Sequence, residues 1–222
     1  MDQIGQAERK TQDRIIQLFT EKLNYKYLGD WEERTNSNLE EGLIRSFLKG
    51  KGYSPALINR ALDKLHATAN NPNESLYINN KNTYQLLRYG VKVKAEAGEN
   101  FESVQLIDWK NPTANHFGIA EEVTVSGGQY TKRPDLVLYV NGIAVAVIEL
   151  KNGRMDIGEG VRQSINNQRK EFIEHFFSTV QFVFAGNDTE GLRFGMIGTP
   201  EKYFLRWKED EFDDSTYEMD KY

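Results

Sequence analysis

"PDLVLYVNGIAVAVIELKNG", residues 134–153, contains two apolar, β-branched runs that are joined by an Asn-Gly pair. Such a pair between two such runs is typical of a tight β-hairpin, because both residues tolerate the positive φ that the turn requires. The stretch carries charge only near the open end of the predicted hairpin, at Asp135, Glu149 and Lys151. A hairpin that is buried in a core has no structural need for these charges. The three residues are therefore the first candidates for a functional site.

The register of the hairpin decides whether these side chains meet. Side chains alternate between the two faces of a strand, so Glu149 and Lys151 project from the same face. A plain two-residue turn would place Asp135 opposite Ile148, on the other face. A slip of one residue, such as a bulge beside Gly142, would bring Asp135 to the face of Glu149. We predict this slip.

Two carboxylates on one face repel each other unless a cation lies between them. A hard divalent ion such as Mg²⁺ takes oxygen ligands and keeps part of its water shell. Lys151 beside that ion would position or deprotonate a water, or neutralise charge that develops on a phosphate. This set of groups suits the hydrolysis of a phosphodiester. The alternative is a salt bridge at the strand ends, which an Asp…Glu-x-Lys pattern often forms by chance.

Two details of the sequence favour the metal site over the salt bridge. Glu149 ends the apolar run "IAVAVI", where an unpaired carboxylate would be costly to bury. Pro134 fixes the backbone before Asp135, at a strand start where proline is tolerated.

Composition narrows the chemistry further. The chain has no cysteine, which excludes disulfides, thiol catalysis and cysteine-based zinc sites. It has three histidines without metal-ligand spacing, His66, His116 and His175. No stretch is apolar and long enough to span a membrane and the first residues do not form a signal peptide, so we expect a cytoplasmic protein without a membrane partner.

The net charge of −5 comes from one segment, residues 208–222, which holds seven acids and two bases. The rest of the chain has 26 acidic and 26 basic residues, so its net charge neither supports nor excludes DNA as a partner.

Helical periodicity dominates the first 90 residues. It predicts helices over 4–23, over 37–50 with Ser37 or Asn38 as N-cap, over 54–69 with Ser54 as N-cap, and over 73–90 with a closing Gly90. Short β-branched runs then predict strands at 91–96, 103–108, 116–125, 134–140 and 143–151, a helix at about 157–176, and strands at 179–187 and 191–198. This order predicts an α/β (α+β) fold with one mixed sheet and a helical N-terminal subdomain.

A basic and aromatic strip lies near the end of the fourth predicted helix. It consists of Lys81, Arg88, Lys92 and Lys94, interleaved with Tyr84 and Tyr89. The strip would suit contacts with phosphates. An ordinary helix face whose long charged side chains cover apolar surface explains the strip better.

The hairpin at 134–153 resembles the catalytic hairpin of PD-(D/E)xK nucleases, specifically that of the R subunit of type I restriction enzymes. Other segments are similar to the N-terminal nuclease region of that family: "RTNSNLEEGLIRSFLKGKGYS", "SLYINNKNTYQLLRYGVKVK", "LIDWKNPTANHFGIAEEVTV" and "TVQFVFAGNDTEGLRFGMIGTPEKYFLRWK". The resemblance covers roughly residues 22–208. It implies a restriction-endonuclease-like mixed sheet flanked by helices, and a Mg²⁺-dependent endodeoxyribonuclease acting on double-stranded DNA, with Mn²⁺ as a substitute.

The resemblance also implies roles for individual residues. Asp135 and Glu149 would be the metal ligands, and Lys151 the catalytic lysine. Families of this kind place an acid on an early helix, pointing at the site. "LEEGLI" offers Glu40 and Glu41, of which Glu40 fits the family spacing L-E-x-x-L-I better.

Relatives carry a Q-x-x-x-Y motif on the helix after the lysine, which helps to position DNA or the active-site elements. Gln163 matches the glutamine, but Asn167 stands where the tyrosine is expected. A shifted candidate, Gln168 with Phe172, keeps an aromatic ring without its hydroxyl. The departure leaves the role of the motif open.

The resemblance implies an organisation in three parts: 1–90 as a mainly helical part of the nuclease domain, 91–207 as the catalytic core, and 208–222 as an acidic linker. In the family a helicase-like motor follows, and this sequence has no G-x-x-x-x-G-K-[ST], so ATP would serve only the full-length subunit. The implied partners are DNA and a methyltransferase core of modification and specificity subunits.

Two alternatives stay open beside this interpretation. The chain could be a related nuclease of a repair or defence system, or a non-catalytic module that docks on DNA or on the methyltransferase core. The intact Asp…Glu-x-Lys pattern argues against the non-catalytic module.

Overall fold

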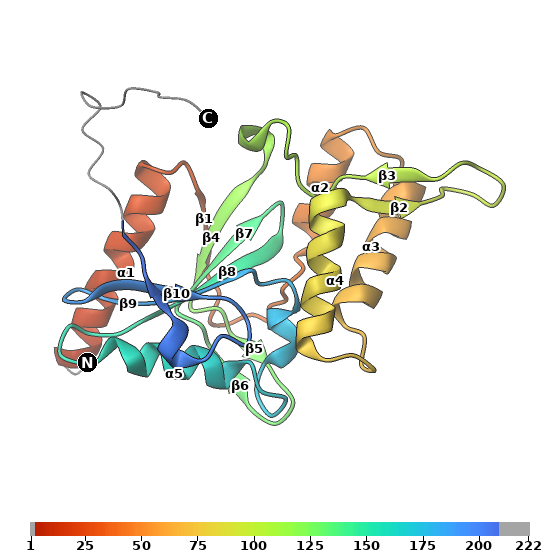
Figure 1. The fold of residues 1–222 in the computed structure, drawn as a ribbon. Helices are drawn as coiled ribbons and strands as arrows, with labels where there is room; N and C mark the ends of the chain where they lie inside the picture. Colours follow the sequence, from red (N-terminus) through yellow and green to blue (C-terminus); the bar gives the residue numbers. More distant parts are fainter. Residues whose placement is uncertain (1–2, 209–222) are drawn as a thin grey trace, which may run out of the picture.

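A mixed sheet of seven strands forms the centre of the computed structural model, which describes residues 3–208 and the side chains of residues 8–208 (Figure 1). The strands follow the order β1 (Lys26–Asp30), β4 (Phe117–Glu121), β7 (Leu136–Val140), β8 (Ile143–Leu150), β9 (Phe182–Asn187), β10 (Gly191–Gly195) and β11 (Leu205–Arg206). The pairs β1–β4 and β8–β9 are parallel and the other neighbours are antiparallel. Apart from Lys208, the predicted acidic linker lies outside the described residues.

Helices cover both faces of this sheet. α1 (Gln3–Glu21) packs Ile15, Ile16 and Phe19 on one face, against residues of β7 and β8. α5 (Ile157–Asn167) packs Ile157 and Val161 on the other face, together with η2 (Glu174–Ser178). The spacings of these apolar residues are helical, so each helix buries one stripe. The predicted mixed sheet flanked by helices is confirmed.

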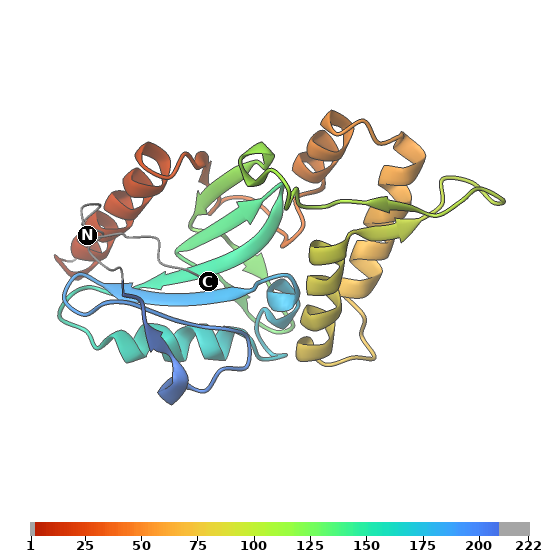
Figure 2. The ribbon, with the colours of Figure 1, turned by 45° about the horizontal axis from the view of Figure 1, so that its top comes forward.

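A second lobe consists of three helices and a hairpin that extends away from the sheet (Figure 2). Its elements are α2 (Glu41–Gly50), α3 (Pro55–Ala69), α4 (Leu76–Tyr89), β2 (Val91–Val93) and β3 (Glu102–Val104). The lobe has its own apolar core, which also includes Ile143 of β8. The lobe is therefore joined to the sheet at the turn of the β7–β8 hairpin.

The remaining elements are short. They are η1 (Pro112–Ala114), β5 (Val125–Ser126), β6 (Thr131–Lys132) and η3 (Glu201–Tyr203). None of the described helices is long and apolar enough to cross a membrane.

Three of the differences from the sequence prediction affect the surroundings of the β7–β8 hairpin. β1 was not predicted, and it joins the main sheet through parallel pairing with β4, so residues before 90 contribute to the central sheet. The helix predicted over 157–176 ends at Asn167, because the following loop bonds to the turn between β5 and β6: Gly128 N–H donates to Phe172 O at 2.8 Å. The helix predicted from 37 begins only at Glu41, because Asn38 donates its side-chain amide to His175 O instead of capping.

The β7–β8 hairpin has the predicted slip of one residue. At the turn Val140 pairs with Ile143, but beyond it Leu138 pairs with Ala146, so Val145 is an extra residue on β8. The bulge therefore lies three residues from the turn, not beside Gly142. The carbonyl of the bulged Val145 accepts a hydrogen bond from Gln181 N–H at 2.8 Å, which satisfies a group that the hairpin ladder leaves unpaired.

This register continues to the open end of the hairpin. Leu136 pairs with Ile148, so the next opposed pair is Asp135 and Glu149. The bulge thus turns both carboxylates to the face that α5 covers, where Val137 and Val147 also point.

Candidate active site

Asp135 and Glu149 are held by hydrogen bonds at the open end of the hairpin. Asp135 Oδ2 accepts from the backbone N–H of Leu150 at 2.5 Å. Glu149 is fully buried, and each of its carboxylate oxygens accepts from an amide of α5. Gln163 Nε2 donates to Oε2 at 2.7 Å, and Asn167 Nδ2 donates to Oε1 at 3.1 Å. Both carboxylates are therefore fixed in orientation.

Burial makes both carboxylates harder to ionise. Burial raises the pKa of Glu149 well above its ordinary value, and the charge of Asp135 raises that pKa further. Burial also raises the pKa of Asp135, against the opposing effects of the Leu150 N–H and the Lys151 charge. A fully buried carboxylate beside a partly buried one is an arrangement that a bound cation would stabilise.

Lys151 follows directly on the strand that carries Glu149. Its N–H donates to Gly186 O at 2.9 Å, and its charge lowers the pKa of both Asp135 and Glu149. Gly160 of α5 lies over it: a Cβ at this glycine would be 3.5 Å from Lys151 Cγ and 3.2 Å from Ala185 Cβ. The glycine lets α5 approach the strands closely, which keeps the lysine stem confined beside the carboxylates.

Two further carboxylates lie at the rim of the site. Glu8 of α1 accepts from Asn152 N–H at 3.2 Å, and its charge raises the pKa of Asp135. Glu122 donates its N–H to Asp135 O at 2.9 Å from a backbone with φ of +50°, and burial raises its pKa. The sequence prediction named neither residue, since neither stands at a recognisable spacing from the hairpin. Their only signal was position: Glu8 lies in a predicted helix, and Glu122 lies within the predicted strand 116–125.

The structure does not bring Glu40 or Glu41 to this site. Glu40 lies at the opposite end of the hairpin, where its N–H donates to Gly142 O at 2.8 Å and its carboxylate pairs with Arg34 at 2.7 Å. Six residues of β8 separate that turn from Glu149, a distance of about 20 Å in a strand. Glu41 forms an ion pair with Arg45, and its Oε1 lies 3.1 Å from His66 Nε2. The early acid that lies near Asp135 is Glu8, on the first helix.

The two predicted glutamines behave differently. Gln163 reaches Glu149, as described above. Gln168 follows the end of α5, where its Nε2 donates to Ser164 O at 3.2 Å and its Oε1 accepts from Gly198 N–H at 2.8 Å. The structure therefore places Gln168 away from the carboxylates, in a contact between the helix end and a loop. Asn167, in the position of the expected tyrosine, is the second residue of α5 that contacts Glu149.

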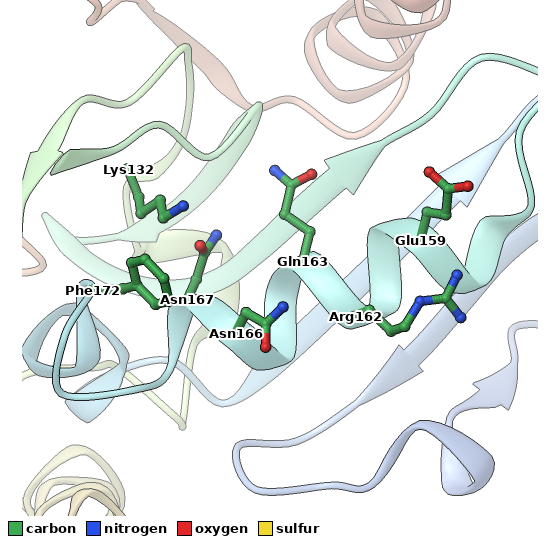
Figure 3. Close-up of a pocket in the computed structure, with 7 residues that line it drawn as sticks. All are labelled: Lys132, Glu159, Arg162, Gln163, Asn166, Asn167 and Phe172. Atoms are coloured by element: carbon green, nitrogen blue, oxygen red, sulfur yellow. The ribbon is translucent and has the colours of Figure 1, made fainter. Parts of the chain in front are cut away.

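An open hollow of about 520 Å³ adjoins Glu149 between α5 and β6 (Figure 3). Gln163 and Asn167 line it on one side, and Lys132 and Phe172 on the other. The Lys132 ammonium lies 4.2 Å from the centroid of the Phe172 ring. The lining of the hollow combines amides and an aromatic ring with two cations, Lys132 and Arg162, and one acid, Glu159.

The donor set fits Mg²⁺ better than a softer metal. Within the described part of the chain, no group of three or more histidine or acidic side chains is arranged to hold a metal ion. Asp135 and Glu149 form a pair of hard oxygen ligands without histidine or cysteine. Mg²⁺ is commonly bound by only one or two carboxylates, together with waters and substrate phosphates.

Comparison with known proteins adds a family. A family model described as "Type I restriction enzyme R protein N terminus" matches residues 5–202. The type I restriction enzyme HindI endonuclease subunit of Haemophilus influenzae is 28% identical over 162 residues, which cover 70% of this chain and 15% of that protein. The protein assigned as the type I restriction enzyme MjaIXP endonuclease subunit of Methanocaldococcus jannaschii is 27% identical over 219 residues, which cover 90% of this chain and 20% of the relative. The chain thus spans a fifth or less of the length of these two relatives.

Proposed function

Because the chain belongs to the family of type I restriction enzyme R proteins, whose N-terminal region it matches, we propose that it is the Mg²⁺-dependent endodeoxyribonuclease part of such an enzyme. Its substrate is double-stranded DNA and its reaction is hydrolysis of a phosphodiester. The observation that carries the proposal is the bulge at Val145, which turns Asp135 to the face of Glu149 beside Lys151. A hairpin without that slip would separate the carboxylates.

Asp135 and Glu149 would hold the metal ion, which, when bound, neutralises phosphate charge and lowers the pKa of water. The protein groups supply the remaining requirements. The Leu150 N–H orients Asp135, and the amides of Gln163 and Asn167 orient Glu149. Such supporting contacts fix the direction of a ligand's lone pairs.

Lys151 acts on the reacting phosphate and water. Its ammonium donates a hydrogen bond to the attacking water or to a non-bridging phosphate oxygen, and stabilises the negative charge of the transition state. Water attacks phosphorus in line with the bond to the 3′-oxygen and loses one proton as its oxygen bonds to phosphorus. The bond to the 3′-oxygen breaks and that oxygen takes up a proton, so the products are a 5′-phosphate and a 3′-hydroxyl. The buried surroundings of Glu149 exclude bulk water and strengthen these interactions.

This chain covers a fifth or less of the length of the two relatives described above. We propose that ATP-driven movement along DNA belongs to parts of the full subunit that this sequence does not contain. The corresponding partners are a methyltransferase core of modification and specificity subunits. Sequence specificity would then reside in that core.

Cleavage of supercoiled plasmid tests the proposal. The wild-type chain is expected to nick or linearise the plasmid with Mg²⁺ or Mn²⁺, while Glu149→Gln and Lys151→Ala leave it intact. Glu41→Gln serves as the matched control, because Glu41 is an exposed acid far from the site, and it should cleave like the wild type. Equal cleavage by wild type and Glu149→Gln would overturn the assignment. If the wild type does not cleave the plasmid, and if its affinity for metal is no higher than that of Asp135→Asn, the result would favour a non-catalytic docking module instead.

A further inference from the structure

The composition of α4 differs from that of the other α-helices. α4 contains no acidic residue, whereas α1, α2, α3 and α5 contain at least one each, for example Glu8, Glu41, Asp63 and Glu159. This is unusual in a chain with 33 acidic residues and a net charge of −5. The exposed side chains of α4 are Tyr77, Lys81, Asn82, Tyr84, Gln85, Arg88 and Tyr89. Every one of them can donate a hydrogen bond, and none carries a negative charge.

Four of these residues form one stripe along the helix. Tyr77, Lys81, Tyr84 and Arg88 follow the spacing i, i+4, i+7 and i+11, which places them on a single face. Rings and cations alternate along this stripe. Tyr77 is 64% exposed to solvent, and Tyr84 is 44% exposed.

Trp109 extends the stripe at the end of α4. Its indole Nε1 donates to Leu87 O at 2.8 Å, which fixes the ring against the last turn of the helix. The Arg88 guanidinium lies 5.2 Å from the Trp109 ring centroid, and the ring remains 46% exposed. We define the α4 face as the stripe of Tyr77, Lys81, Tyr84 and Arg88 together with Trp109.

Coverage of apolar surface by long charged side chains does not account for this face. Such coverage would hide the rings from water, yet the rings remain exposed. Within the described residues, no ion pair involves Lys81 or Arg88, whereas arginines such as Arg45 and Arg162 each pair with an acid. The face therefore presents cations without a neutralising acid in the helix. The sequence grouped Lys92 and Lys94 with this strip, but Lys92 lies on β2 and Lys94 directly follows that strand, with its ammonium 4.7 Å from the centroid of the Phe101 ring.

The α4 face has a fixed position relative to the candidate active site. Asn80, on the buried side of α4, donates to Phe177 O at 3.1 Å and to Val180 O at 2.7 Å. These carbonyls lie in and just after η2, and η2 follows Phe172, which lines the hollow beside Glu149. In Figure 1, α4 stands beside the light-blue η2.

We propose that the α4 face is a second DNA-contacting surface, which binds the backbone of duplex DNA away from the scissile phosphate. The proposal rests on the proposed function, since it takes DNA as the substrate. The stripe from Tyr77 to Arg88 is about 17 Å long at the rise of an α-helix. Duplex DNA has a phosphate about every 3.4 Å of axis on each strand, so the face can reach several phosphates. Ammonium, guanidinium and phenol groups are donors that bind phosphate oxygens without reading sequence.

Equilibrium binding of a fluorescent duplex tests the proposal, with the full chain in EDTA so that the DNA is not cut. The double variant Lys81→Ala/Arg88→Ala is expected to bind several-fold more weakly than the wild type. The slope of log affinity against log salt should fall in magnitude by about 1.8, because each lost phosphate contact removes about 0.9. Tyr77→Phe/Tyr84→Phe, which keeps both rings, should weaken duplex binding less than the removal of the two cations.

Two controls separate this surface from the active site and from bulk charge. Arg45→Ala/Arg193→Ala removes the same charge elsewhere, from one exposed and one partly exposed arginine, and should keep the wild-type salt slope. Glu149→Gln should bind the duplex at least as tightly as the wild type while losing cleavage.

The possible failures are distinguishable. A Lys81→Ala/Arg88→Ala variant that matches Arg45→Ala/Arg193→Ala would overturn the α4 proposal and leave the nuclease proposal standing. If Lys81→Ala/Arg88→Ala weakens the binding of a single-stranded probe more than the binding of the duplex, the assignment of duplex DNA to the α4 face would be overturned. A wild-type chain that binds neither probe would contradict both proposals, since DNA would then not be the substrate.

Discussion

At the scale of single residues, the site depends on how Glu149 is held. Its carboxylate is fully buried, and burial together with the charge of Asp135 raises its pKa. The protein must therefore supply hydrogen-bond donors that stabilise the ionised form. Gln163 and Asn167 provide the two side-chain donors. The hairpin residues Asp135, Glu149 and Lys151 were predictable from the sequence, because their spacing is local. The contribution of Asn167 was not, because an asparagine in place of tyrosine gives no signal until its distance to Glu149 is known.

Removal of the Asn167 amide is expected to weaken metal binding. Asn167→Leu leaves Glu149 Oε1 without its described side-chain donor, so the carboxylate is less well oriented. Loss of such a supporting contact typically costs about 10–100-fold in metal affinity or activity. Titration with Mn²⁺ measures this effect. Asn166→Leu is the matched control, because Asn166 is the exposed neighbour and makes no bond to Glu149, and it should keep the wild-type affinity.

The raised pKa of Glu149 predicts a pH dependence of stability in the metal-free protein. A carboxyl group whose pKa is higher in the folded than in the unfolded state makes folding less favourable as pH rises from the unfolded pKa to the folded pKa. Glu149→Gln removes this effect. Its free energy of unfolding relative to the wild type should therefore increase from about pH 4.5 upward, by about 1.4 kcal/mol for each unit of pKa shift. Urea unfolding in EDTA across pH measures the difference; a difference that is independent of pH would contradict the raised pKa.

At the scale of elements, the β7–β8 hairpin explains both what the sequence revealed and what it did not. The Asn-Gly turn and the need for a slip follow from the sequence, since the turn type and the alternation of side chains are local properties. The position of the bulge at Val145 depends on Gln181, which is distant in sequence. β1 is similarly invisible in the sequence, because a five-residue edge strand with Gly29 is defined by its pairing with β4.

The turn itself should be sensitive at Asn141. This residue is fully buried with φ of +53°, and its side chain donates to Leu106 O and Asn115 Oδ1 and accepts from His116 N–H. Asn141→Ala is expected to destabilise the protein by about 2–4 kcal/mol, because it leaves buried polar groups unpaired and because alanine tolerates positive φ less well than asparagine does. Asn24→Ala is the control: Asn24 also has positive φ, of 57°, but is exposed, so it should cost about 1 kcal/mol. Equal losses of stability in urea unfolding would show that the buried hydrogen bonds of Asn141 contribute nothing.

At the scale of the whole molecule, two packing units meet around the hairpin. The sequence suggested a division near residue 90, yet α1 and β1 belong to the sheet, and β2 and β3 belong to the helical lobe. The reason is that a boundary in composition marks where helical periodicity ends, whereas packing is decided by contacts between distant segments. We propose that the lobe contributes to DNA binding, because it carries the α4 face and holds that face beside η2.

Asn80 should couple the lobe to the sheet. Asn80→Ala removes the donor shared by Phe177 O and Val180 O, two buried carbonyls, at an expected cost of about 1–3 kcal/mol. Hydrogen exchange should then accelerate in residues 176–183 more than in β4 or β7. Asn82→Ala, on the exposed side of the same helix, is expected to leave these rates unchanged. Acceleration spread evenly over the sheet would mean that Asn80 supports overall stability and not this junction.

The measurement that tests the central claim most directly is calorimetric titration of Mn²⁺ into the wild-type chain, Asp135→Asn and Glu149→Gln. We expect the wild type to bind Mn²⁺ at one site and either substitution to remove that site, because the bulge at Val145 directs both carboxylates to one ion. Retention of wild-type affinity by either variant, with folding intact, would contradict the claim that Asp135 and Glu149 form one metal site.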